Sequence, residues 1–181
     1  MDEMNLRRRY GYLWTGEAFA AIFFVTLFLW SAYQDGVWQR WIVRGYSLAI
    51  VILILMQGMI WWRWKLRLLR NNQRQMPAPV LTAYRIWRRI NWWLIGCFPL
   101  VVLLTTLLTN QPFLSADTVY GLFILGGAIL EQINYYYVQL MYDSAYDWAN
   151  LRTHRRLRRG TIGKALDAHI TRQDKGIETN G

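Results

Sequence analysis

Long apolar segments alternate with basic segments along the 181-residue chain. Four segments carry at most one charged residue each, and each is long enough for a helix to cross a bilayer core of roughly 30 Å. They cover residues 10–33, 45–62, 90–109 and 118–142. Backbone polar groups must be hydrogen-bonded within lipid, so continuous apolar runs predict helices rather than barrel strands. The sequence therefore predicts an all-α integral membrane protein built as a bundle of four transmembrane helices.

The Lys and Arg residues gather on one side of the predicted membrane. Of the 21 in the chain, all but Arg40 and Arg44 precede the first segment, follow the fourth, or lie between the second and third. The positive-inside rule then places both termini in the cytoplasm. Trp and Tyr residues cluster at the same borders, where amphipathic rings favour the headgroup layer. We therefore expect a multi-pass protein of a plasma membrane, the inner membrane in a bacterium.

Two parts of the chain resemble each other when the sequence is offset by 74 residues, which aligns Tyr46 with Tyr120 and Gln57 with Glu131. The first and third segments align in a similar way. This pattern predicts two tandem helical hairpins that arose by internal duplication, related by an axis along the membrane normal. Chance similarity between apolar helices is the alternative explanation.

The basic segments are expected to extend three of the helices into the cytoplasm. Residues 64–75 contain no Gly or Pro and follow directly from the second apolar segment. Pro77 and Pro79 then break the helix before the third segment begins. The second and third helices are thus expected to project as an antiparallel pair, and the fourth to continue to about Arg159.

The chain is expected to divide after Gly160, the predicted end of the fourth helix. Residues 1–160 form the transmembrane domain with its cytoplasmic helical extensions, and residues 161–181 form a short cytoplasmic tail. A short helix is expected at 164–170, followed by disorder from Thr171.

Two ionisable residues, Glu17 and Glu131, lie inside the predicted membrane at one depth. At 1.5 Å per residue, both fall roughly 8–9 Å below the cytoplasmic border. Ionisable groups in membrane helices are costly and are functional candidates for that reason. Further polar residues in the same layer complete a predicted ligand or proton site, namely Gln57, Gln132, Asn134 and Tyr135.

Three interpretations of this polar layer remain open. In the first, Glu17 and Glu131 are protonated by desolvation and hydrogen-bond to Gln57, Asn134 or a tyrosine, which fixes helix packing. In the second, the carboxylates and the aromatic rings receive a cation, a proton or an amphipathic molecule. In the third, the layer contacts a membrane helix of a partner protein.

Several familiar chemistries find no support in the sequence. His154 and His169 both lie in the tail, so the predicted bundle contains no histidine to bind a metal or haem. The Glu-x-x-His pattern of di-iron bundles is absent, and Cys97 has no thiol partner. No catalytic residue, cofactor or metal site is predicted, and the sequence favours a protein that is not an enzyme.

Two basic clusters are expected to contact anionic lipid headgroups or an acidic face of a partner protein. Nucleic acid is a weaker alternative, because the topology rule already accounts for the excess of Arg. The clusters comprise Arg63, Lys65, Arg67, Arg70, Arg155, Arg156, Arg158 and Arg159.

The leading functional hypothesis is a non-catalytic accessory, assembly or regulatory subunit that works through membrane-embedded and basic cytoplasmic contacts. Its expected partners are anionic lipids and either another protein or a second copy of the chain. The alternative is a small transporter or channel that uses Glu17 and Glu131. A lipid-modifying enzyme would need a nucleophile and base, and no such pair is evident.

Overall fold

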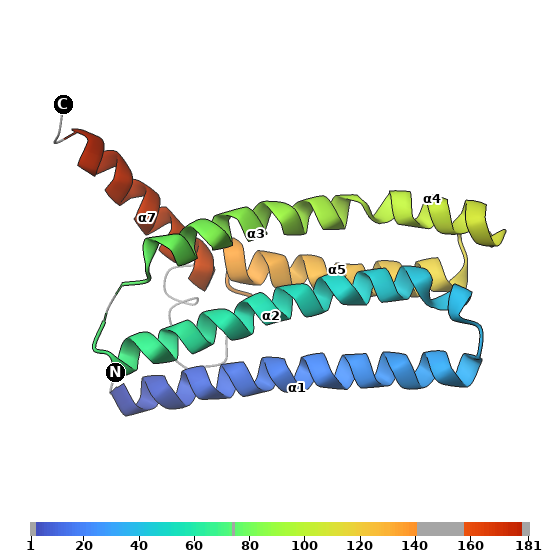
Figure 1. The fold of residues 1–181 in the computed structure, drawn as a ribbon, viewed down its shortest axis with the longest axis horizontal. Helices are drawn as coiled ribbons and strands as arrows, with labels where there is room; N and C mark the ends of the chain where they lie inside the picture. The colour runs from blue at the N-terminus through green and yellow to red at the C-terminus, as the bar shows by residue number, and fades with distance from the viewer. Residues whose placement is uncertain (1–2, 74, 141–157, 179–181) are drawn as a thin grey trace.

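The computed structural model describes residues 3–73, 75–140 and 158–178 (Figure 1). Its elements are α1 (Glu3–Asp35), a 3₁₀ turn (Trp38–Trp41), α2 (Ile42–Arg70), α3 (Ala78–Gly96), α4 (Phe98–Thr109), α5 (Ala116–Tyr136) and α7 (Thr161–Glu178). Within these described ranges every regular element is helical, apart from one isolated β-bridge between Val138 and Arg159. The all-α prediction is confirmed.

Four helical stretches are long and apolar enough to cross a membrane: Met4–Asp35, Trp38–Arg70, Ala78–Thr109 and Ala116–Tyr136. They lie side by side, with α1 on the outside of the bundle and α7 leaving it at an angle (Figure 1). α2 is the central helix and packs against α1, α4 and α5. Half of the apolar window of α2 is buried, compared with 6% of that of α1, so α1 is attached to the bundle mainly through α2.

Small residues bring α5 close to α2. A Cβ atom at Gly121 would lie 3.2 Å from the backbone carbonyl of Val43 and would overlap the Val43 side chain. Ala128, two turns further along α5, is completely buried. Helices in lipid associate through such close packing, because lipid gives no hydrophobic driving force between them. The two helices run in the same direction (Figure 1).

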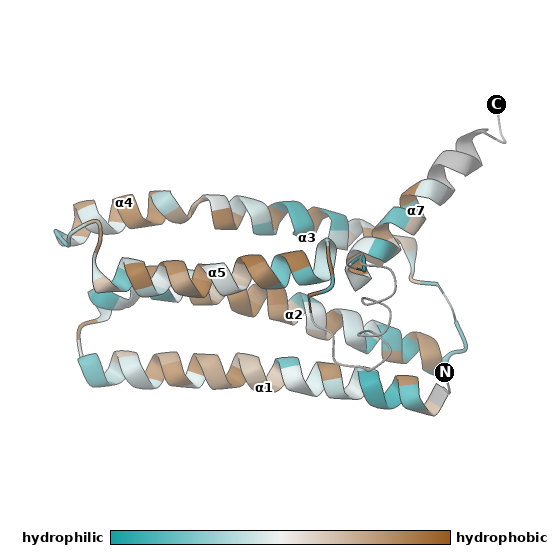
Figure 2. Cartoon of the chain, turned by 180° about the vertical axis from the view of Figure 1, so that it is seen from behind, coloured by the Kyte–Doolittle hydropathy of each residue, from teal (hydrophilic) through white to brown (hydrophobic). Residues whose placement is uncertain are grey.

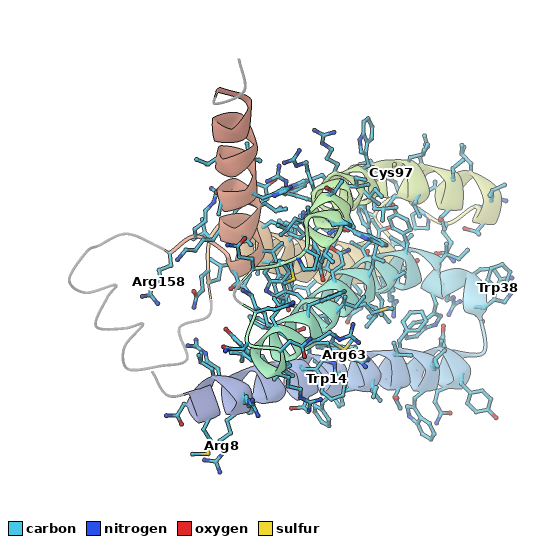
Figure 3. All side chains as sticks on the ribbon, turned by 60° about the vertical axis from the view of Figure 1, so that its left-hand side comes forward. Arg8, Trp14, Trp38, Arg63, Cys97 and Arg158 are labelled. Atoms are coloured by element: carbon cyan, nitrogen blue, oxygen red, sulfur yellow. The ribbon has the colours of Figure 1, made fainter. Side chains whose placement is uncertain are left out.

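The third apolar segment is interrupted, whereas the sequence analysis treated it as continuous. α3 ends at Gly96 and α4 begins at Phe98, with Cys97 between them (Figure 3). Pro99 explains the interruption: it lacks an N–H to donate to the carbonyl one turn earlier, and its ring collides with that turn.

The fourth helix ends at Tyr136, so the predicted continuation of this helix is wrong where the structure describes the chain. The N–H of Val138 donates to the carbonyl of Ile133, and the chain then pairs with Arg159. Asp143, Asp147 and Trp148, through which the extension was predicted, lie outside the described residues.

Gly160 does not end the fourth helix; it allows α7 to begin directly against the end of α5. A Cβ atom at Gly160 would lie 2.5 Å from the carbonyl oxygen of Tyr135, and one at Gly163 would overlap the carbonyl oxygen of Tyr136. Only glycine permits such an approach between backbones.

α7 is longer than the helix predicted at 164–170, and its residues 171–178 are helical where disorder was expected. Its first half joins the hydrophobic core, because Ile162 and Leu166 are almost completely buried there. The two positions are one helical turn apart and therefore lie on the same face. The predicted disorder at 179–181 lies outside the described residues.

The break before the third segment is where the prolines predicted it. α2 ends at Arg70, five residues earlier than expected, and α3 begins immediately after Pro77. Asn72, between them, has a positive φ of 52°, which a helix does not allow.

Candidate functional site

The predicted polar layer is divided by the structure into two parts with different surroundings. Gln57 and Gln132 are buried in a network of amide hydrogen bonds. The remaining predicted residues line a cavity of about 480 Å³ between α1 and α5, and they are Glu17, Glu131, Asn134 and Tyr135. The sequence placed these groups at one depth but could not separate them.

Asn91 is the centre of the buried network. Its side chain exchanges two hydrogen bonds of 2.9 Å with Gln57 and donates another of 2.8 Å to Gln132. Tyr136 donates to the Gln57 side chain and Tyr84 to the Gln57 backbone carbonyl, each at 2.7 Å. These bonds connect α2, α3 and α5. The network is internally satisfied, which indicates a role in packing rather than in binding.

Asn91 was not predicted from the sequence, because it lies at the edge of the third apolar segment, next to the aromatic border. A detectable signal was present: Asn91 is an amide within the uncharged segment 90–109. A buried amide needs hydrogen-bond partners, and Gln57 and Gln132 were candidates for this role.

Glu17 connects three helices. Its Oε1 atom accepts a hydrogen bond of 2.6 Å from the indole N–H of Trp62 in α2, and a second from the hydroxyl of Tyr135 in α5. Gly58 makes room for this arrangement, because a Cβ atom there would overlap the Tyr135 hydroxyl and crowd the Glu17 carboxyl. The Oε2 atom is buried and accepts no hydrogen bond from the part of the chain that the structure describes. The hydrogen bonds of Glu17 thus attach α1 to α2 and α5.

Glu131 is much less constrained. Its hydrogen bond, from the amide of Asn134, measures 3.5 Å and is weak at that length. Glu131 lines the cavity just described and also a second cavity of about 630 Å³. The two cavities adjoin, since Ala20 and Leu55 also line both.

We refer to the two adjoining cavities together as the α1–α5 groove. Towards the 3₁₀ turn its walls are mainly apolar and aromatic, and they include Phe24, Phe28 and Phe123. Towards α7 its walls are more polar than in the other half, although still mainly apolar, and they include Arg9 and Gln139. Glu131 lines both halves, so a carboxylate lies where the groove becomes more polar.

Arg44 closes the far end of the groove, where Asp117 accepts hydrogen bonds from the backbone N–H groups of Val43 and Arg44 at 2.9 and 3.1 Å. The Arg44 guanidinium lies 3.1 Å from the same carboxylate and stacks over Trp41 and Tyr120, 4.3 and 4.8 Å from their ring centres. Asp117 therefore caps α2 from α5. This pair was not predictable from the sequence, because residues 73 positions apart give no local signal.

The basic cluster on α2 is divided between two surfaces. Of the cluster on α2, Lys65 faces a cavity beside α7. The other members line a shallow groove on a different side of α2 next to Trp14, and they are Arg63, Arg67 and Arg70.

The second basic cluster is only partly described. Arg158 and Arg159 line the same cavity as Lys65. Arg155 and Arg156 lie outside the described residues. The structure thus brings one residue of the first cluster together with two of the second, which the sequence did not predict.

The described residues contain no group of three or more His, Cys, Asp or Glu side chains able to hold a metal ion. The fold and the site define an all-helical chain with four helices long and apolar enough to cross a membrane, the architecture of a multi-pass membrane protein. Comparison with protein-family models, with curated proteins and with solved structures finds no match.

Proposed function

We propose that this protein is a non-catalytic accessory, assembly or regulatory subunit, and that its α1–α5 groove receives side chains from a transmembrane helix of a partner protein. The observation that carries this proposal is the attachment of α1. α1 packs mainly on α2, and its flank towards α5 leaves the groove open. A partner helix that lies over the groove would cover it.

The chemistry of the groove indicates what the partner helix presents. Phe24, Phe28 and Phe123 form apolar walls that suit aliphatic side chains. Glu131 is the one carboxylate of the groove without a strong hydrogen bond among the described residues. A carboxylate at membrane depth is costly unless it is paired, so the partner contributes a cationic or hydrogen-bonding group at that level.

We also propose that both termini lie in the cytoplasm and that the membrane is the plasma membrane, or the inner membrane of a bacterium. Arg8 and Arg158 lie at one end of the bundle and Trp38 at the other (Figure 3). Hydrophilic parts of α1, α2 and α3 gather at the end that carries the N-terminus (Figure 2). This segregation supports cytoplasmic extensions of α2 and α3 that meet anionic headgroups.

An internal duplication into two helical hairpins belongs to the same proposal. The aligned helices α2 and α5 run parallel and pack together from Val43 with Gly121 to Gly58 with Tyr135. Their matched polar residues have diverged, since Gln57 is buried in the amide network while Glu131 lines the groove.

A site-specific photo-cross-linker tests the helix-binding groove. Introduced at Phe123, which lines the groove and is 83% exposed, it is expected to give a discrete protein adduct in native membranes. Leu108 on α4 is the matched control, because it is 81% exposed and lines none of the cavities described above.

The cross-linking outcome separates a partner helix from bulk lipid. An adduct of one defined mass from Phe123, absent from Leu108 and weakened by Glu131→Gln, is the expected result. Adducts to lipid alone, or equal protein adducts from both positions, would contradict the proposal.

A small transporter or channel is the second candidate, because Glu17 and Glu131 line the same cavity. Protons are the simplest probe for it. In proteoliposomes with an internal pH dye and an imposed potential, this candidate requires a proton flux that Glu131→Gln abolishes and Asp35→Asn leaves intact. A flux equal to that of empty vesicles would exclude it.

A further inference from the structure

A second cavity, of about 1060 Å³, lies between the end of α2, the beginning of α3 and the first half of α7. It adjoins the α1–α5 groove, since Gln139, Arg158 and Thr161 line both. Among the described residues, however, neither α1 nor α5 contributes to its wall. Four cationic side chains line it, namely Lys65, Arg158, Arg159 and Lys164.

The acidic group described in its wall is already engaged. Asp167 lies 2.8 Å from the Nε atom of Arg159 and accepts a hydrogen bond of 3.2 Å from its guanidinium. For the charges of Lys65 and Lys164, the described residues of the wall provide no second carboxylate.

Lys65 and Lys164 line the cavity from different helices, and two positive charges that share one cavity repel each other. Lys65 is half-buried, and its ammonium group lies 5.3 Å from the ring centre of Trp61. Two ammonium groups held beside one cavity favour a bound anion, because the anion replaces repulsion with attraction.

The two lysines lie on helices, Lys65 on α2 and Lys164 on α7. Gly160 and Gly163 bring the start of α7 against the carbonyls at the end of α5, and Ile162 and Leu166 fix its buried face. The first turn of α7 also faces the cavity through Thr161. The N-terminal end of a helix carries partial positive charge, which adds to the field of the lysines.

We propose that this cavity binds a phosphate group, either in the headgroup of an anionic lipid or in a soluble phosphorylated molecule. Lys65 and Lys164 supply charge-assisted hydrogen bonds to the phosphate oxygens, which lysine makes as a point charge. The site does not depend on the partner helix proposed for the groove.

Binding is measured on the full chain in detergent, in two arms. Native mass spectrometry counts bound phosphatidylglycerol, with phosphatidylcholine as the competitor, and calorimetry measures binding of inorganic pyrophosphate. Lys65→Gln and Lys164→Gln are each expected to weaken binding about tenfold, as the loss of one charge-assisted hydrogen bond implies. Preference for phosphatidylglycerol identifies a lipid ligand, and binding of pyrophosphate identifies a soluble one.

Arg40→Gln is the control, since it removes one positive charge from the 3₁₀ turn, outside this cavity and away from the basic ends of α2 and α3. It is expected to change binding less than twofold. Lys65→Arg keeps the charge and is expected to retain binding, which separates loss of the site from loss of the fold. Equal losses in Arg40→Gln and Lys65→Gln, or no binding in either arm, would overturn the proposal.

Discussion

Gly58 is the residue on which the position of Glu17 depends. The Tyr135 hydroxyl and the Glu17 carboxyl occupy the space that a side chain at this position would fill. Trp62, one turn further along α2, donates to the same carboxyl. The attachment of α1 to the other helices therefore requires a glycine at position 58 as well as the hydrogen-bonding groups of Glu17, Trp62 and Tyr135.

Gly58→Ala is expected to destabilise the protein by about 1–3 kcal/mol, because the added methyl displaces both groups and disturbs the hydrogen bonds of Glu17. The measurement is the free energy of unfolding in mixed micelles as the fraction of denaturing detergent is raised. Gly126→Ala is the control: nothing lies within 4 Å of a Cβ at this helical glycine, so the change should be neutral or stabilising. Equal destabilisation by the two variants would refute this account of Gly58.

Glu17 and Glu131 share a depth in the predicted membrane but differ in their contacts. Their depth was predictable, because each lies a fixed number of residues from an aromatic border. Their roles were not predictable, because hydrogen bonding to Trp62 and Tyr135 depends on how α1 packs. The Glu17 carboxyl accepts hydrogen bonds from α2 and α5, whereas the Glu131 carboxyl lines the groove with one weak hydrogen bond among the described residues.

At the scale of the element, α2 begins with a cap supplied by another helix. Asp117 in α5 accepts from two backbone N–H groups of the first turn of α2 and pairs with Arg44. Its side chain is 2% exposed, so solvent hardly competes for these interactions. This contact fixes the start of α2 relative to α5.

Asp117→Asn is expected to reduce the free energy of unfolding by about 2–4 kcal/mol. An asparagine keeps one acceptor oxygen but presents an NH₂ group to the other of the two backbone donors, and it leaves Arg44 without its counter-ion. Asp35→Asn provides the comparison, because the Asp35–Arg40 pair is more exposed and spans 3.8 Å. Its effect should stay below about 1 kcal/mol. Comparable thermal shifts for the two variants would show that Asp117 is not a specific cap.

α7 and the interrupted α3–α4 span illustrate element boundaries that periodicity alone does not locate. Pro99 was visible in the sequence, and its consequence for Cys97 follows from proline chemistry. The start of α7 depends instead on Gly160 and Gly163 meeting the last carbonyls of α5. That contact joins segments about 25 residues apart, so no local sequence pattern predicts it.

At the scale of the whole molecule, the proposed topology gives a direct accessibility prediction. Cys97 is the one cysteine of the chain, so a Cys97→Ser background permits single-cysteine labelling. With both termini in the cytoplasm, Gln34→Cys should react with an impermeant maleimide in intact spheroplasts, and Gln73→Cys only after permeabilisation. Both side chains are exposed, so a difference in labelling reports the side of the membrane and not burial within the protein. The reverse pattern would contradict the topology.

The sequence by itself determined the helices and the side on which the basic residues gather. Both follow from local composition, because a bilayer requires long apolar helices and charge remains at their ends. Tertiary structure decided which polar residues pair and which remain available. Asn91 completes the buried network, Gly58 places Glu17, Asp117 caps α2, and α7 brings Lys164 to Lys65. Each of these contacts joins residues distant in the chain, and its energy depends on packing that only the assembled bundle provides.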